Sequence, residues 1–178
     1  VAVIVGNTLG AIAAKAATKT IPIVFGVPSG PVELGLVTSL ARPGGNVTGI
    51  NFFVSEVVSK RLRLLKDLVP KAVRVAVLVN PTNASVTEST LRGMHEAAPA
   101  IGLQFQILNA TTIGEIDAAF AALSREHIDA LFVAGDAFFS GRRGQFSTLA
   151  ARDRLPVAYA THDFVTAGSL LRHGPDVA

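Results

Sequence analysis

The sequence contains no cysteine and no tryptophan, and it has one methionine and one tyrosine among 178 residues. Without cysteine the chain cannot form a disulfide, a thiolate metal site or a cysteine nucleophile, and it fits either redox compartment. Aromatic residues make up only 6% of the chain, although hydrophobic residues make up 49%. Valine, alanine, leucine and isoleucine must therefore build the core, as they do in parallel strands that are covered on both faces.

Long apolar runs and a large excess of one charge are also missing. No stretch approaches the roughly 20 apolar residues of a membrane-spanning helix, and the formal net charge is only +3. The densest basic stripe lies in a predicted helix over residues 56–68 and consists of Lys60, Arg61, Arg63 and Lys66. The same helix is amphipathic, with a core face predicted to contain Val57, Leu62, Leu65 and Val69. We therefore expect the basic side chains on its solvated face and predict no nucleic-acid partner.

Motifs of the common α/β enzymes are absent as well. The sequence has no Gly-x-Ser-x-Gly elbow, no Walker A motif and no Gly-x-Gly-x-x-Gly fingerprint. Its four histidines lack the spacing of metal ligands; they are His95, His127, His162 and His173. We therefore predict a protein that is not an enzyme and that uses no metal or other cofactor.

The most informative stretch is 74–83, RVAVLVNPTN, where a β-branched apolar run ends in turn residues. Such a run predicts a strand buried on both faces, and the following segment 85–101 is predicted to be a helix. Asn80 and Asn83 flank Pro81 in the loop between them. Both Asn side chains could contact a ligand, although Asn80 could simply stabilise the turn and Asn83 could cap the helix.

Strand and helix patterns alternate along the rest of the chain, which predicts an α/β fold with parallel sheets and flanking helices. One of the predicted helices runs from Pro31 to about Leu40. The amino end, VAVIVGNT, nearly repeats the strand and loop at 74–83, which suggests two lobes. We predict an incomplete first lobe over 1–53, a hinge or connecting helix over 54–72 and a second lobe over 73–178. Because the chain starts inside a strand, we expect it to be a fragment.

Several segments of the chain resemble one protein family, that of the ABC transporter substrate-binding proteins, which includes tryptophan- and tyrosine-type binders. The most specific match is LARPGGNVTG at 40–49. The other matches include AIAAKAA at 11–17, IPIVF at 21–25, the Gly-Asp-x-Phe-Phe motif at 135–139 and FVTAG at 164–168. The resemblance implies two Rossmann-like lobes of the periplasmic-binding-protein type, joined by a hinge, with a ligand in the cleft between them.

The resemblance also implies a function and partners. It implies an extracytoplasmic or periplasmic solute-binding component of an ABC importer, with a permease and an ATPase as partners. The ligand would be a small molecule, such as an amino acid or another carboxylate. A ligand-sensing domain of a regulator or receptor with the same fold is the alternative, and an α/β enzyme is the weakest interpretation. The exposed edge of an incomplete first lobe would also favour a homodimer.

Candidate ligand contacts in the first lobe lie where its strands end. Asn7 and Thr8 begin a helix, whose free N–H groups suit a carboxylate, although either residue could merely cap that helix. Ser29 and Gly30 follow the next strand and could equally form an ordinary turn.

Two further candidates, Asn51 and Phe52, end the third strand. The resemblance implies a polar ligand contact close to this point, although Asn51 could instead be a strand residue that points to solvent.

In the second lobe we expect Asp136 to be the main contact. It follows a buried strand, so its carboxylate could bind a ligand ammonium group while Phe138 packs on an apolar part of the ligand. The alternative role for Asp136 is to cap the next helix. Tyr159 and His162 complete the candidates, because the resemblance implies a variable position there that sets ligand identity.

Overall fold

The computed structural model describes residues 2–28, 30–160 and 171–172, and the chain divides into two compact units. The first unit is Val1–Val54 and the second is Ser55–Ala178. Each unit contains a sheet of parallel strands with helices between them, which confirms the predicted α/β fold. Apart from its first residue, the predicted connecting segment 54–72 belongs to the second unit.

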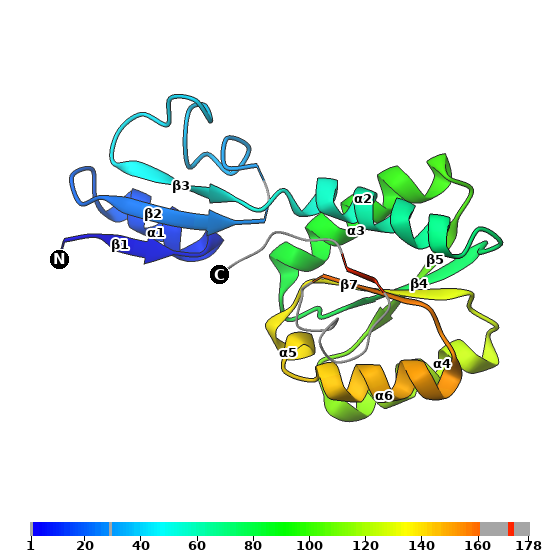
Figure 1. The fold of residues 1–178 in the computed structure, drawn as a ribbon. Coiled ribbons are helices and arrows are strands. Elements are labelled where there is room, and N and C mark those ends of the chain that lie inside the picture. Colours follow the sequence, from blue (N-terminus) through cyan, green and yellow to red (C-terminus); the bar gives the residue numbers. More distant parts are fainter. Residues whose placement is uncertain (1, 29, 161–170, 173–178) are drawn as a thin grey trace. The chain divides into compact units, whose positions relative to one another are not determined.

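The first unit is a three-stranded parallel sheet with one helix (Figure 1). Its elements are β1 (Ile4–Gly6), α1 (Thr8–Ala17), β2 (Ile23–Val27) and β3 (Val47–Asn51). The strand order is β1-β2-β3, so β2 is central, and the register pairs Ile4 with Ile23 and Ile23 with Val47. The core residues of this unit are Ala11, Ile23, Phe25, Val27, Leu36, Val37 and Val47.

The helix predicted from Pro31 to about Leu40 does not form. Residues 31–36 make consecutive turns instead, in which the Leu36 N–H donates to the Pro31 carbonyl at 2.9 Å. Gly35 adopts a φ of 65°, in the left-handed region. A residue in that conformation ends a right-handed helix, so the segment turns back after a single turn.

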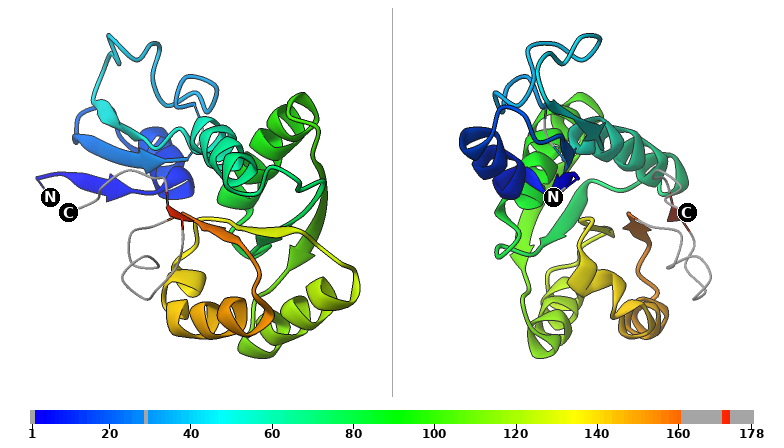
Figure 2. Two further views of the ribbon diagram at one scale, coloured as in Figure 1. Left: turned by 45° about the vertical axis from the view of Figure 1, so that its right-hand side comes forward. Right: turned by 90° about the vertical axis from the view of Figure 1, so that its left-hand side faces the viewer.

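The second unit is a five-stranded parallel sheet with helices on both faces (Figures 1 and 2). Its strands are β4 (Arg74–Val79), β5 (Gln104–Asn109), β6 (Ala130–Val133), β7 (Val157–Tyr159) and β8 (Leu171–Arg172). Its helices are α2 (Val54–Leu68), α3 (Ala84–Ala100), α4 (Ile113–Arg125), α5 (Ala137–Ser140) and α6 (Arg143–Asp153). Helices α2 and α3 cover one face of the sheet, and α4 and α6 cover the other.

The strand order of this sheet is β5-β4-β6-β7-β8. The chain therefore leaves β4 toward one side to form β5 and then crosses back to form β6 on the other side. Such a reversal is a topological switch point, and in open parallel sheets ligands bind outside the carboxyl ends of the strands at that point. The fold therefore directs attention to the loops that follow β4 and β6.

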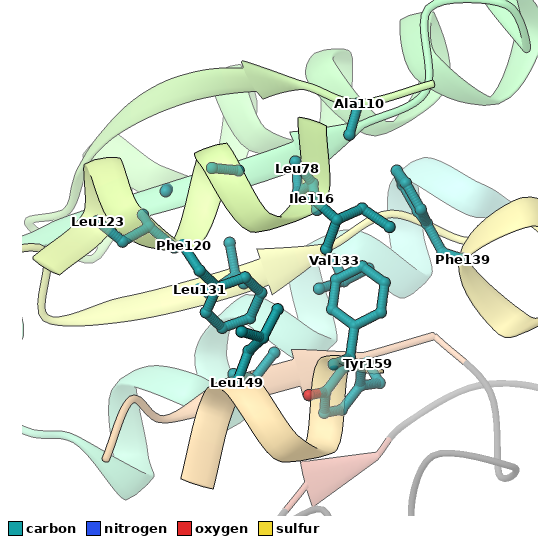
Figure 3. Close-up of a cluster of buried hydrophobic side chains, with 14 of the residues drawn as sticks. Leu78, Ala110, Ile116, Phe120, Leu123, Leu131, Val133, Phe139, Leu149 and Tyr159 are labelled. Atoms are coloured by element: carbon teal, nitrogen blue, oxygen red, sulfur yellow. The ribbon is translucent and has the colours of Figure 1, made fainter. Parts of the chain in front are cut away.

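An apolar cluster packs between the sheet and the α4/α6 layer (Figure 3). Phe146 of α6 lies at its centre, with ring centroids 6.0 Å from Phe120, 5.6 Å from Phe139 and 6.2 Å from Tyr159. Edge-to-face ring pairs at such distances add stability beyond the burial of their area. The cluster fixes the position of β6, β7 and α5 relative to one another.

On the opposite face, α2 does not match its predicted pattern. Arg61 was expected on the solvated face of this helix, but the structure leaves only 2% of it exposed. The buried residues of α2 are Val58, Arg61, Leu62 and Leu65. They follow the spacing i, i+3, i+4 and i+7 of a core-facing stripe, so Arg61 lies inside the stripe although it carries a charge.

Candidate functional site

Three polar side chains meet at the switch point of the larger sheet. Asn80 directly follows β4, Asn83 precedes α3, and Asp136 lies between β6 and α5. β4 and β6 are neighbours in register, with Leu78 opposite Val133. The ends of these strands, the start of α3 and α5 therefore lie at the same edge of the sheet (Figure 1).

The Asp136 carboxylate is the centre of this group. Its Oδ1 accepts hydrogen bonds from the Asn80 side-chain amide at 3.1 Å and from the Phe138 N–H at 2.9 Å. Its Oδ2 accepts a hydrogen bond from the Asn83 side-chain amide at 2.9 Å. A carboxylate offers about four acceptor positions, so these three bonds leave room for one more donor on Oδ2. Asp136 is 9% exposed.

Asn80 has a second role in the same loop. Its Oδ1 accepts from the Thr82 N–H at 3.1 Å and from the Thr82 hydroxyl at 2.7 Å, while its carbonyl accepts from the Thr87 hydroxyl at 2.7 Å. Asn80 thus stabilises the turn and holds Asp136 at once. Asn83 precedes α3 without forming a side-chain cap, and its amide nitrogen donates to Asp136.

Asp136 also caps α5 through its bond from Phe138, so capping does not exclude a ligand contact. The Phe138 ring is half-buried, and the Arg142 guanidinium carbon lies 3.8 Å from its centroid. Arg142 also donates to the Phe138 carbonyl at 3.1 Å. One face of the ring is therefore covered by a cation, which leaves less of Phe138 for a ligand than the sequence suggested.

In the first unit, the two candidate asparagines bond to their own loops. Asn7 caps α1, with its Oδ1 accepting from the Gly10 N–H at 3.1 Å, and Thr8 is the first residue of that helix. The Asn51 Oδ1 accepts from the Phe53 N–H at 2.9 Å. Phe52, next to Asn51, is 40% exposed.

Four candidates remain. Gly30 lies in the loop between β2 and the turns at residues 31–36, where its carbonyl accepts from the Leu34 N–H. Tyr159 is only 1% exposed and belongs to the apolar cluster against α6, so its side chain packs in the core. Ser29 and His162 lie outside the described residues.

Arg61 was expected only as a solvated basic residue and was not predicted to support the site, yet it reaches the same end of the sheet from α2. One terminal nitrogen of its guanidinium donates to the carbonyls of Val133 at 2.7 Å and Ala158 at 3.0 Å. Burial lowers the pKa of Arg61 to about 9, which still leaves the side chain protonated at neutral pH. Its helical spacing relative to Leu62 and Leu65 was the signal that could have identified it as buried.

The family model described as ABC transporter substrate binding protein matches residues 1–177. The chain belongs to this family. A tyrosine-binding protein from Clostridioides difficile is 32% identical over 170 residues, which are 96% of this chain and 48% of that protein. The family and this relative are substrate-binding proteins and not enzymes, as predicted from the sequence.

Solved structures of similar proteins agree with the family. A conserved domain protein from Vibrio cholerae has a TM-score of 0.77 and 29% identity, over 98% of this chain and 58% of that one. A ligand-free, open substrate-binding protein from Clostridium difficile has a TM-score of 0.67 and 32% identity, over 95% and 56%. A Streptococcus pneumonia domain in complex with L-Trp shares the fold, with a TM-score of 0.71 and 22% identity, over 96% and 58%.

The chain spans about half the length of these relatives. Among the residues that the structure describes, no helix is long and apolar enough to cross a membrane. In the same part of the chain, no group of three or more histidine, cysteine or acidic side chains is placed to hold a metal ion.

Proposed function

We propose that this chain is the ligand-binding part of an extracytoplasmic solute-binding component of an ABC importer, and that it binds an amino acid through Asp136. The observation that carries the proposal is the Asp136 carboxylate, which Asn80 and Asn83 hold at the switch point of the larger sheet. Family membership supports import over the alternative of a sensing domain.

The chemistry of the group favours a cationic partner. Two side-chain amides and a backbone N–H orient the carboxylate without neutralising its charge, and one acceptor position remains on Oδ2. A ligand ammonium group can donate there, and a charge-assisted bond of this kind is about twice as strong as a neutral one. The tyrosine-binding relative from Clostridioides difficile supports an amino acid as the ligand class.

A thermal-shift experiment on the 178-residue chain tests the ligand class. L-tyrosine is compared with its deaminated analogue, which keeps the ring and the carboxylate but lacks the ammonium group. Ligand at 100 times its Kd adds about 2.7 kcal/mol to the stability of the native state. We expect L-tyrosine, or another α-amino acid tested in the same way, to raise the melting temperature. The deaminated analogue of that amino acid should leave the melting temperature unchanged. Equal shifts with both members of a pair would contradict the role of Asp136.

The importer role implies a permease and an ATPase as partners and a location outside the cytoplasm, where substrate-binding proteins of importers act. In a pull-down with this chain as bait, we expect to capture the permease together with its ATPase, and more of both when ligand is present. Activity of the chain as part of a transcriptional regulator would contradict the importer role.

The open edge of the first unit supports a further partner, a second copy of the chain. β1 lies at the edge of its described sheet, and apolar side chains in it and next to it are exposed, with Val5 of β1 at 76% and Leu9 of α1 at 79%. Unpaired edge strands with apolar side chains favour pairing with another chain. Light scattering is expected to give the mass of a dimer that Val5→Lys shifts toward monomer. A monomer at all concentrations tested would contradict this proposal.

A further inference from the structure

Arg61 is a buried cation on the sheet-facing side of α2. It is 2% exposed, and within the described part of the chain its Nε has no hydrogen-bond partner and no carboxylate forms an ion pair with it. Its guanidinium carbon lies 4.1 Å from the centroid of the Phe132 ring. Burying a charge is costly unless the fold uses the bonds that the charge makes.

Those bonds are made where the pairing of β6 and β7 ends. The last register pair of the two strands is Phe132 with Ala158. One guanidinium nitrogen donates both to the Ala158 carbonyl and to the carbonyl of Val133, one residue beyond that pair. Arg61 therefore bonds the carboxyl ends of both strands to α2, just where the backbone pairing of β6 and β7 ends.

The bond from Arg61 to the Val133 carbonyl lies three residues before Asp136. Between them, the Ala134 N–H donates to the Leu78 carbonyl of β4 at 3.0 Å. A Cβ added at Gly135 would lie 3.3 Å from the Ala160 side chain, so this backbone also runs close to the end of β7. The segment that presents the Asp136 carboxylate is thus bonded to β4 and, through Arg61, to α2, and it lies close to the end of β7.

We propose that Arg61 is a positioning residue for the Asp136 site, which it keeps in the geometry that Asn80 and Asn83 require. This inference rests on the proposed function for its effect on ligand binding, but not for its effect on the geometry. A bound constellation must be held within about 0.5 Å of its productive arrangement by supporting groups. Arg61 provides that support from α2, through the carbonyls of Val133 and Ala158.

The test uses Arg61→Met, which keeps the length and apolar packing of the side chain but removes its donors. The matched control is Leu65→Ala, because Leu65 is buried to the same degree one turn along the same face of α2. Two quantities are measured: the affinity for L-tyrosine, and the NMR signals of the Asn80 and Asn83 side-chain amides that donate to Asp136.

We expect Arg61→Met to shift both amide signals and to weaken L-tyrosine binding by about tenfold or more. Leu65→Ala should lower stability without either change. Arg61→Lys keeps the charge and can donate to both carbonyls, so it should restore the signals and most of the affinity. If Arg61→Met fails to fold, Arg61→Gln is measured in its place, and unchanged amide signals and affinity in that variant would overturn the proposal.

The two proposals fail in different ways. If the chain binds no amino acid but Arg61→Met still displaces the amide signals, the proposed function is wrong and the positioning role stands. If L-tyrosine binds and Arg61→Met lowers stability as Leu65→Ala does, while the signals and affinity stay at their wild-type values, Arg61 is merely structural and the inference is overturned.

Discussion

Gly93 lies where α3 crosses α2, and a methyl group added there should destabilise the second unit. A Cβ at this position would lie 2.8 Å from the Ser55 carbonyl oxygen and 2.9 Å from the Val58 Cβ. Both distances are shorter than an ordinary van der Waals contact, and one of the two atoms belongs to the backbone. The two helices would have to move apart to accept Gly93→Ala.

The sign of the effect depends on two opposing quantities. Alanine is favoured over glycine inside a helix by about 1 kcal/mol, whereas overpacking of a well-packed interface costs about 1–3 kcal/mol. We therefore expect Gly93→Ala to lower the free energy of unfolding by about 1 kcal/mol, with a larger loss for Gly93→Val.

Gly144 of α6 is the matched control, because a Cβ added there meets no heavy atom within 4 Å. Gly144→Ala should therefore stabilise the unit by up to about 1 kcal/mol. Urea denaturation followed by circular dichroism measures both variants. If Gly93→Ala were stabilised as much as Gly144→Ala, the close crossing of α2 and α3 would be refuted.

Three further predictions concern single sites. Gly49→Ala should unfold the first unit, because the added methyl would overlap the Phe25 carbonyl oxygen on the paired strand; native amide signals from β2 and β3 would contradict this. Thr112→Ala removes the capping box with Glu115 and should cost about 1 kcal/mol in urea denaturation. Bonds from the Arg74 and Val73 N–H groups lower the pKa of Asp129 below its ordinary 3.8. The ionised Asp129 therefore stabilises the fold fully above pH 3.8, and this stabilisation is lost as the pH falls through the lowered pKa. In Asp129→Asn, the free energy of unfolding should depend less on pH in this acid range.

Much of the fold could be predicted because its signals are local. The apolar run of β4 and the turn residues after it marked a buried strand and a loop. Thr112 and Glu115 form a capping box at the start of α4, and their spacing of three residues is visible in the sequence. These features depend on residues a few positions apart, so the sequence itself contains them.

Features that depend on conformation or distant contacts were harder to predict. The helix expected after Pro31 fails because Gly35 takes a positive φ, which composition alone does not require. The bonds from Asn80 and Asn83 to Asp136 join residues 56 and 53 positions apart. They could be inferred only once the order of β4 and β6 in the sheet was known.

Arg61 shows a different limit. Its charge suggested a solvated position, while its spacing relative to Leu62 and Leu65 placed it on the buried stripe. The two indications conflicted, and the structure resolves the conflict through carbonyl acceptors at Val133 and Ala158 that no local pattern reveals.

The central claim is that the Asp136 carboxylate binds the ammonium group of an amino acid. Calorimetric titration of the chain with L-tyrosine, or with the amino acid that gives the largest thermal shift, tests it most directly. Asp136→Asn removes the charge but nearly keeps the shape, and exposed Asp67→Asn on α2 is the control for net charge. A bond to a charged group contributes about 1.5–3 kcal/mol, so Asp136→Asn should weaken binding about 10- to 150-fold. Unchanged affinity in Asp136→Asn, or an equal loss in Asp67→Asn, would contradict the claim.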